Sequence, residues 1–325
     1  MGKIVAVFNQ KGGVGKTSTV SCLATELVSR GKKVLAIDAD QQENLSYSFK
    51  IIPQQHYVTI YDLLKDEVNG VYRGDLSDAI IETDAFVHLI PGSVRMAGMD
   101  RLLFKVTPFT AQLDSVLDDY AKDNNNMRRK IESAGLTEDT KEFIRSRRDY
   151  LDKETRYKEK LISSDLYIEK DGDFLLRNML APVKDEYDYI LIDCPPALSS
   201  ITINILTAAD RLIIPMTPEP FAASGLTHLI ANVDVINKLN NPDLKISGLL
   251  FTMVQPNLKV SNALIEQTKE TQRSSLYIYE TKIPRSTELN KAYARMTPLI
   301  EYNRSNPVRI AYSDFCDEFL SREEA

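Results

Sequence analysis

The sequence predicts an α/β fold, a doubly wound and mostly parallel sheet flanked by helices. Short apolar runs recur along the chain, and near-continuous apolar runs are typical of strands that are buried on both faces. Stretches with helical spacing separate most of these runs. Because strands that alternate with helices form a parallel sheet covered on both sides, the two observations predict the same architecture.

The first predicted strand lies close to the N-terminus, where residues 3–8 read KIVAVF. The other apolar runs predicted as strands span residues 33–37, 87–91, 189–193, 211–216 and 246–252, and a shorter run spans 275–279. The predicted helices span residues 16–30, 199–209, 223–239 and 259–273. Gly31 follows the first of these helices, as a C-capping glycine does.

The composition is that of an ordinary globular protein, with 325 residues, 43% hydrophobic and 26% charged. It excludes disordered, collagen-like and disulfide-stapled classes. The net charge of −6 means that nucleic-acid binding would need a local basic patch. The three cysteines are widely spaced and indicate free thiols rather than a metal site. With no signal peptide and no apolar stretch approaching about 18 residues, we expect a cytoplasmic protein.

Residues 98–182 interrupt the alternation of strands and helices. This stretch contains no convincing buried strand, and residues 141–160 carry eight basic against five acidic side chains. Apolar positions there recur at mostly helical spacing. We predict a single domain over residues 1–325 with a mainly helical insertion over 98–182. Two interpretations of the insertion stay open: a solvated helical hairpin that packs on the core, or a surface that binds a partner or DNA.

Residues 10–18 read QKGGVGKTS and hold the strongest chemical motif. Gly15, Lys16 and Thr17 match the end of the phosphate-loop pattern, whereas Gln10 replaces its first glycine. The motif follows a predicted strand and opens a helix, so glycines and the helix N-terminus can direct backbone N–H groups at phosphates. Lys16 can reach the β- and γ-phosphates, and Thr17 can give its hydroxyl to magnesium.

A second lysine, Lys11, is better placed to cross a dimer interface than to fold back onto its own nucleotide. The K-G-G-x-G-K-[ST] loop resembles the deviant Walker A motif of the ParA/MinD family of P-loop ATPases. By this resemblance Lys11 contacts the nucleotide of the opposite subunit in an ATP-dependent homodimer. The predicted nucleotide-binding residues of the loop are Lys11, Gly12, Gly13, Val14, Gly15, Lys16, Thr17 and Ser18.

Three carboxylates complete the predicted site at the ends of strands, where open α/β sheets bind their ligands. Asp38 and Asp40 lie just past the end of the second strand, in a segment that resembles the family's D-x-D-P-Q-x-N motif, with Gln41 in place of proline. Carried over by position, Asp40 orients the attacking water and Asp38 supports the magnesium shell. Asp193 ends an apolar strand in the Walker B arrangement and is predicted to bind magnesium through water. The predicted catalytic set is Lys11, Lys16 and Asp40, and the cofactors are ATP and Mg²⁺.

Weaker resemblances follow further along the chain. Thr252-Met253 and Ile283-Pro284-Arg285 resemble family segments near the adenine, which makes Met253, Pro284 and Arg285 candidate nucleotide contacts. Residues 89–93, LIPGS, resemble the chromosome-partition branch. The resemblance covers residues 1–97 and 183–325 and leaves out the insertion.

The partition branch of the family binds DNA without sequence preference and is turned over by a ParB-type centromere-binding adaptor. The acidic C-terminus argues against membrane binding, because it lacks the basic, apolar face of a membrane-surface helix. The resemblance therefore implies a slow, partner-stimulated ATPase in plasmid or chromosome partition, associated with the nucleoid when ATP-bound. A protein-positioning scaffold that does not use DNA is the alternative. The candidate DNA-binding residues are Lys259, Lys269, Arg273 and Arg295.

Overall fold

The computed structural model describes residues 2–53, 57–69, 71, 75–103, 172–220, 222–272, 276–299 and 305–324. The chain divides into two compact units, one formed by Met1–Asp100 with Asp173–Ala325 and the other by Arg101–Gly172. Most of the predicted insertion over 98–182 lies outside the described residues, so its helical character stays a prediction. Its two ends form the short helices α4 (Met99–Leu103) and α7 (Leu175–Leu180).

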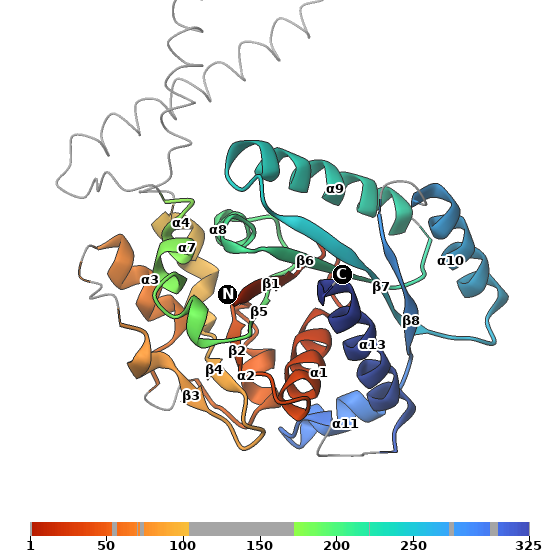
Figure 1. Cartoon of the computed structure of the whole chain (residues 1–325), viewed down its shortest axis with the longest axis horizontal. Coiled ribbons are helices and arrows are strands. Elements are labelled where there is room, and N and C mark those ends of the chain that lie inside the picture. Colours follow the sequence, from red (N-terminus) through yellow and green to blue (C-terminus); the bar gives the residue numbers. More distant parts are fainter. Residues whose placement is uncertain are drawn as a thin grey trace, which may run out of the picture. The chain divides into compact units, whose positions relative to one another are not determined.

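The core of the first unit is an eight-stranded sheet in the order β3-β4-β2-β5-β1-β6-β7-β8 (Figure 1). Every neighbouring pair is parallel except β3 with β4, so the predicted mostly parallel sheet is confirmed. The strands are β1 (Lys3–Val7), β2 (Val34–Asp38), β3 (Ile81–Glu82), β4 (His88–Ile90), β5 (Tyr189–Asp193), β6 (Arg211–Met216), β7 (Lys245–Val254) and β8 (Ile278–Pro284).

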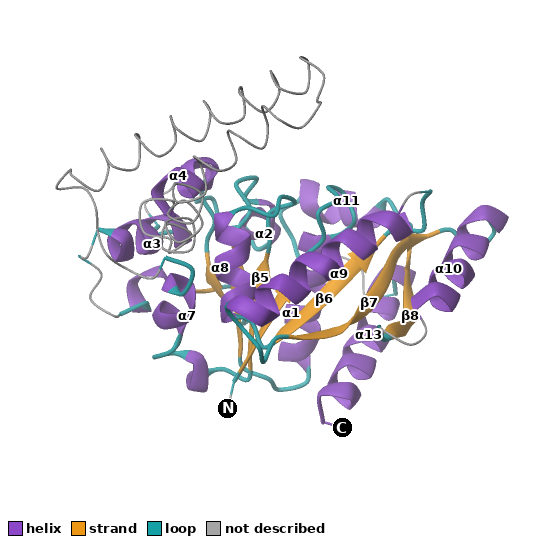
Figure 2. Cartoon of the chain, turned by 90° about the horizontal axis from the view of Figure 1, so that it is seen from above, coloured by secondary structure: helices purple, strands orange, loops and turns teal. Residues whose placement is uncertain are grey.

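Helices cover both faces of this sheet, with α8 and α9 on one side and α1 and α13 on the other (Figures 1 and 2). Besides α4 and α7, the helices among the described residues are α1 (Lys16–Ser29), α2 (Asn44–Ser48), α3 (Ile60–Val68), α8 (Ser200–Ala208), α9 (Ala222–Leu239), α10 (Lys259–Gln272), α11 (Glu288–Ala294) and α13 (Pro307–Glu324). Short 3-10 turns span Ser77–Ala79, Val94–Gly98 and Lys184–Glu186.

The last strand differs from its prediction. Residues 275–279 are the apolar run, but β8 spans Ile278–Pro284 and continues through the polar residues 280–282. β8 lies at the edge of the sheet, where a strand tolerates polar residues. The apolar pattern of the sequence therefore predicts the wrong bounds for this strand. The Glu318 carboxylate of α13 accepts hydrogen bonds from the backbone N–H groups of Glu280 and Thr281, at 2.8 and 3.0 Å. It thereby covers part of the edge that no other strand pairs.

The C-terminal helix α13 closes the core over α1 and β8. Its apolar side chains Tyr312, Phe315 and Phe319 are all 1% exposed or less. At its end, Glu323 forms ion pairs with Lys3 of β1 (2.8 Å) and with Arg211 of β6 (3.0 Å). The two cations offset the cost of burying the Glu323 carboxylate. These ion pairs hold the end of α13 against the amino-terminal ends of β1 and β6.

Among the described residues, no helix combines the length and the apolar character that a membrane crossing requires.

Candidate functional site

The loop between β1 and α1 has the strand–loop–helix context that the sequence predicted. Gly13 and Gly15 adopt φ angles of 74° and 84°, a left-handed conformation that residues with a Cβ rarely adopt. Gly15 is the N-cap of α1, and Lys16 is the first residue of the helix. The backbone N–H groups at this helix end therefore face outward, as an anion site requires.

The two side chains that follow Gly15 point into the loop region. Lys16 is 6% exposed, and its ammonium donates to the Lys11 carbonyl at 3.4 Å. Thr17 Oγ1 donates to Asp193 Oδ2 at 2.6 Å. The structure therefore brings together two of the residues predicted for magnesium, although 176 positions separate them in sequence.

The carboxylates Asp38 and Asp193 lie side by side at the carboxyl ends of β2 and β5, which pair in register at these residues. Both are fully buried. Asp38 Oδ2 accepts hydrogen bonds from Ser46 N (2.8 Å) and Ser46 Oγ (2.6 Å). Within the described part of the chain, the Oδ1 atom of each aspartate has no hydrogen-bond partner. Buried oxygens without a partner are costly, and a ligand that bound to them would remove this cost.

Burial raises the pKa of both carboxyl groups, because water no longer solvates their charges. The pKa of Asp38 rises to about 7, although the two hydrogen bonds from Ser46 oppose the shift. The pKa of Asp193 lies well above its ordinary value through burial and through repulsion by Asp38, while the Thr17 hydroxyl opposes the shift. A nearby divalent cation would offset both effects, so the electrostatics fit a cation site.

The donor set fits magnesium in particular. Two carboxylates and one hydroxyl supply only oxygen ligands, which Mg²⁺ prefers. Among the described residues, no group of three or more His, Cys, Asp or Glu side chains could hold a metal alone. Magnesium usually keeps several waters and shares phosphate oxygens, so an incomplete protein shell suits it.

Asp40 lies two residues beyond Asp38 and is 8% exposed. Its Oδ1 accepts a hydrogen bond from the Gln42 backbone at 3.0 Å. The carboxylate therefore lies in the turn after β2, at the same edge of the sheet as Asp38 and Asp193. Its predicted role with the attacking water stays a prediction.

Comparison with known proteins places the chain in a family. Residues 2–126 and 137–246 match the AAA domain family. The chain is 30% identical to the sporulation initiation inhibitor protein Soj of Bacillus subtilis, over 98% of both chains. It is 31% identical to the chromosome partitioning protein ParA of Caulobacter vibrioides, over 99% of this chain and 95% of that one. The chain belongs to the ParA/MinD superfamily of P-loop ATPases.

Solved structures share the fold of this ParA/MinD member at lower identity. The structure of cobyrinic acid a,c-diamide synthase from Mycobacterium smegmatis, with bound ADP and magnesium, has a TM-score of 0.68 and 23% identity, covering 100% of this chain and 96% of that one. A septum site-determining protein MinD from Pyrococcus horikoshii, complexed with Mg-ADP, has a TM-score of 0.63 and 19% identity, covering 100% and 99%.

Lys11, the second lysine of this ParA/MinD loop, lies at the surface and forms an ion pair with Glu219 of the segment after β6. The side chains are 46% and 54% exposed, so the pair contributes little to stability and can separate easily. The Lys11 ammonium holds the pKa of Glu219 below its ordinary range. Beside the pair lies a cavity of about 310 Å³, lined by Asn9, Gln10, Lys11, Val14, Met216, Thr217, Pro220, Ala222 and Gly225.

The predicted adenine contacts lie together at the ends of β7 and β8. Pro284 pairs with Val254, and Arg285 N donates to the Val254 carbonyl at 2.9 Å. Met253 has a positive φ of 53° and a side chain that is 38% exposed. Their contact with adenine stays a prediction.

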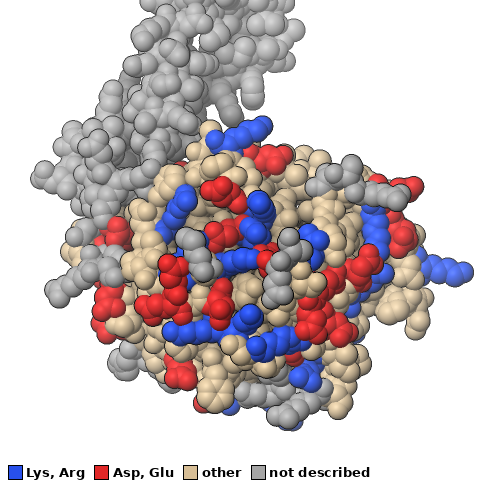
Figure 3. All heavy atoms as spheres, viewed as in Figure 1, with Lys and Arg blue, Asp and Glu red and all other residues tan. Residues whose placement is uncertain are grey.

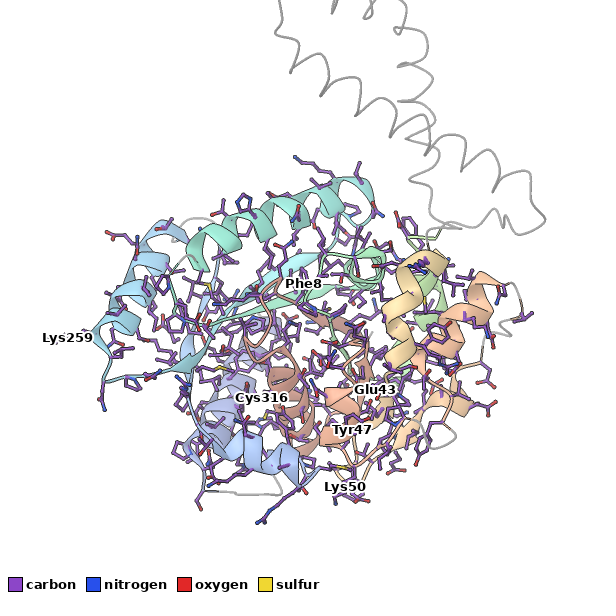
Figure 4. All side chains as sticks on the ribbon, turned by 180° about the vertical axis from the view of Figure 1, so that it is seen from behind. Phe8, Glu43, Tyr47, Lys50, Lys259 and Cys316 are labelled. Atoms are coloured by element: carbon purple, nitrogen blue, oxygen red, sulfur yellow. The ribbon has the colours of Figure 1, made fainter. Side chains whose placement is uncertain are left out.

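The predicted DNA-binding residues that the structure describes lie in two places, in α10 and just after α11. Lys259 is exposed at the start of α10, far from Glu43 and Tyr47 beside the site (Figure 4). Lys269, in the last turn of α10, pairs with Glu280 at 3.3 Å. Arg295 follows α11, and Arg273 lies outside the described residues. The face shown in Figure 3 carries acidic and basic side chains interspersed rather than one continuous basic patch.

Sequence reasoning missed the residues that support the carboxylates. Ser46 binds Asp38 and accepts a hydrogen bond from Gly92 N at 2.9 Å. A Cβ on Gly92 would lie 2.9 Å from Asp38 Cγ, so only glycine allows this close approach. The LIPGS segment that contains Gly92 was the available signal. Glu43, which accepts a hydrogen bond from Val94 N at 2.7 Å, had no such signal.

A further support comes from Thr252, the neighbour of Met253. Its Oγ1 donates to the Val14 carbonyl at 2.8 Å, across 238 positions of sequence. The segment Thr252-Met253 was expected near the adenine, which stays a prediction; the structure adds a contact of Thr252 with the phosphate loop.

Proposed function

We propose that this chain is a ParA-type partition ATPase. ATP and Mg²⁺ are its cofactors, and the ATP-bound form is a homodimer that binds DNA without sequence preference. A ParB-type centromere-binding adaptor stimulates slow hydrolysis, and the released monomers leave the nucleoid. The observation that carries the proposal is the contact of Thr17 with Asp193 at the end of a two-lysine phosphate loop whose Lys11 is exposed.

Each residue has a distinct task in this proposal. The loop backbone and the Lys16 ammonium bind the β- and γ-phosphates. Thr17 and Asp193 hold magnesium, with Asp38 behind them, and the cation neutralises charge that develops on the phosphates. Asp40 orients the attacking water, because its carboxylate lies in the turn after β2, at the same edge of the sheet as Asp38 and Asp193.

Lys11 is assigned to the nucleotide of the second subunit. We expect Lys11→Ala to keep MgADP affinity within about threefold, because its own nucleotide lies against Lys16. ATP-dependent dimerisation should disappear, since the ATP of each subunit loses a cation from its partner. Light scattering with chromatography, with and without ATP, measures the outcome. Glu219→Gln is the matched control and should still dimerise; a Lys11→Ala protein that dimerises with ATP contradicts the assignment.

The DNA-binding step is tested with the Asp40→Ala protein, which should hydrolyse ATP slowly and accumulate as the ATP-bound dimer. We expect it to bind unrelated DNA duplexes equally with ATP and weakly with ADP. The logarithm of the binding constant should fall steeply with the logarithm of salt concentration, because lysines and arginines displace counterions from phosphates. Fluorescence anisotropy over a salt series measures both. Hydrolysis at the wild-type rate would remove Asp40 from its assigned role.

A protein-positioning scaffold is the second candidate. It is favoured by the net charge of −6 and by the interspersed charges of Figure 3. McdA of Cyanothece, a solved structure with a TM-score of 0.65 and 22% identity, shares the fold. Absence of DNA binding at low salt by an ATP-bound Asp40→Ala dimer would select this candidate over partition.

A further inference from the structure

Two tyrosines from the C-terminal part of the chain contact hydroxyl groups at the start of α1. The Tyr293 hydroxyl of α11 donates to Ser18 Oγ at 2.9 Å. The Tyr312 hydroxyl of α13 lies 3.3 Å from Thr19 Oγ1. Ser18 and Thr19 directly follow Lys16 and Thr17, which are assigned to the phosphates and to magnesium, so both contacts are made within the first helical turns behind the loop.

The direction of the Tyr312 contact follows from the hydrogen-bond inventory of a hydroxyl group. Thr19 Oγ1 donates its single proton to the Gly15 carbonyl at 2.8 Å. It can therefore only accept from Tyr312, which becomes the donor. Thr19 is 0% and Tyr312 is 1% exposed, so both groups are shielded from water. The result is a directed chain from Tyr312 through Thr19 to Gly15.

This chain fixes a peptide group of the phosphate loop. The Gly15 carbonyl also accepts from Thr19 N at 2.9 Å, so two donors hold it on the side of α1. In a trans peptide the C=O and the following N–H point in opposite directions. The Lys16 N–H is thereby aimed out of the helix end. Thr252 acts similarly one peptide earlier, by holding the Val14 carbonyl.

Burial raises the pKa of the Tyr293 and Tyr312 phenols well above their ordinary value, so both stay protonated and keep donating. A loop whose carbonyls are already fixed loses less freedom when an anion binds, which favours affinity. We propose that Tyr312 and Tyr293 are positioning residues of the phosphate loop, Tyr312 acting on Gly15 through Thr19 and Tyr293 acting on Ser18. The inference rests on the proposed nucleotide site and adds a link from α11 and α13 to it.

A double-mutant cycle tests the chain of contacts. Titration calorimetry with MgADP would compare the full-length wild type, Tyr312→Phe, Thr19→Val and the double variant. We expect Tyr312→Phe to raise the dissociation constant roughly three- to tenfold, the range of one lost hydrogen bond, and Thr19→Val to raise it at least as much, because it also loses the bond to the Gly15 carbonyl. Because both act through the same contact, the double variant should bind like Thr19→Val alone. Unchanged affinity in Tyr312→Phe, or independent additive losses, overturns the proposal.

Tyr279→Phe is the matched control. Tyr279 is also fully buried, and its hydroxyl lies 2.7 Å from Ser247 Oγ, away from the loop. This variant should lower the melting temperature and leave MgADP affinity unchanged. If Tyr312→Phe behaves in the same way, its role is only structural and the proposal fails.

The second arm uses Tyr293→Phe with Ser18→Ala in the same design, with the same expected non-additivity and the same overturning outcome. Failure of the inference is distinguishable from failure of the proposed function. A wild type that does not bind MgADP overturns the nucleotide site itself. A wild type that binds it, with affinities unchanged in both tyrosine variants, overturns only the positioning roles.

Discussion

Lys16→Ala should lower MgATP affinity by roughly a hundredfold or more. Lys16 is the buried cation of the phosphate loop, with 6% of its surface exposed. Its ammonium supplies a charge-assisted hydrogen bond to an anion in a site with little water, which is among the strongest single polar contacts. Titration calorimetry with MgATP on the folded variant measures the loss.

Lys245→Ala is the control for this experiment. Lys245 is exposed at the start of β7, at the sheet edge opposite the site, so its removal should leave affinity unchanged. Circular dichroism would check that the Lys16→Ala protein is folded. A folded Lys16→Ala protein with wild-type MgATP affinity would contradict the assignment of the loop.

The second large effect is on stability without nucleotide. Asp38→Asn should stabilise the ligand-free protein, and more so at pH 8 than at pH 5. In the folded chain the pKa of Asp38 is about 7, against an ordinary value of 3.8. As pH rises from 3.8 to 7, the unfolded chain releases this proton while the folded chain retains it, so the free energy of unfolding falls.

The size of this penalty follows from 1.36 kcal/mol per pKa unit, which gives up to about 4 kcal/mol above pH 7 and close to none below pH 4. Urea unfolding of wild type and variant at pH 5 and pH 8 measures it. Asp84→Asn, whose side chain is 75% exposed, removes an equal charge and serves as the control. Equal effects of Asp38→Asn at the two pH values would contradict the prediction.

The sequence predicted the parts of the site whose residues lie close together along the chain. The phosphate-loop motif is a run of consecutive residues, 10–18. Asp38 and Asp193 each directly follow or end an apolar run. Because parallel strands place their carboxyl ends at one edge, the meeting of these aspartates could be expected before the structure. The confirmed sheet and the register of Asp38 with Asp193 show why this reasoning worked.

The supporting contacts could not be predicted because they join residues that are distant in sequence. Thr252 reaches Val14 across 238 positions, and Tyr312 reaches Thr19 across 293. Neither the spacing of apolar residues nor a short sequence motif indicates which distant residues will contact each other. The bounds of β8 were missed for another reason: an edge strand tolerates polar residues, so its apolar pattern is weak.

The position of β1 in the sheet determines when the site can form during synthesis. β1 is made first, but its hydrogen-bonded neighbours are β5 and β6, which end at residues 193 and 216. Tyr312, which donates to Thr19, lies still further along the chain, in α13 (Pro307–Glu324). The ribosome must therefore release β5, β6 and α13 before the loop at residues 10–18 is held on all sides. Nucleotide then stabilises only chains in which these segments have folded, because binding can favour only a state in which the site exists.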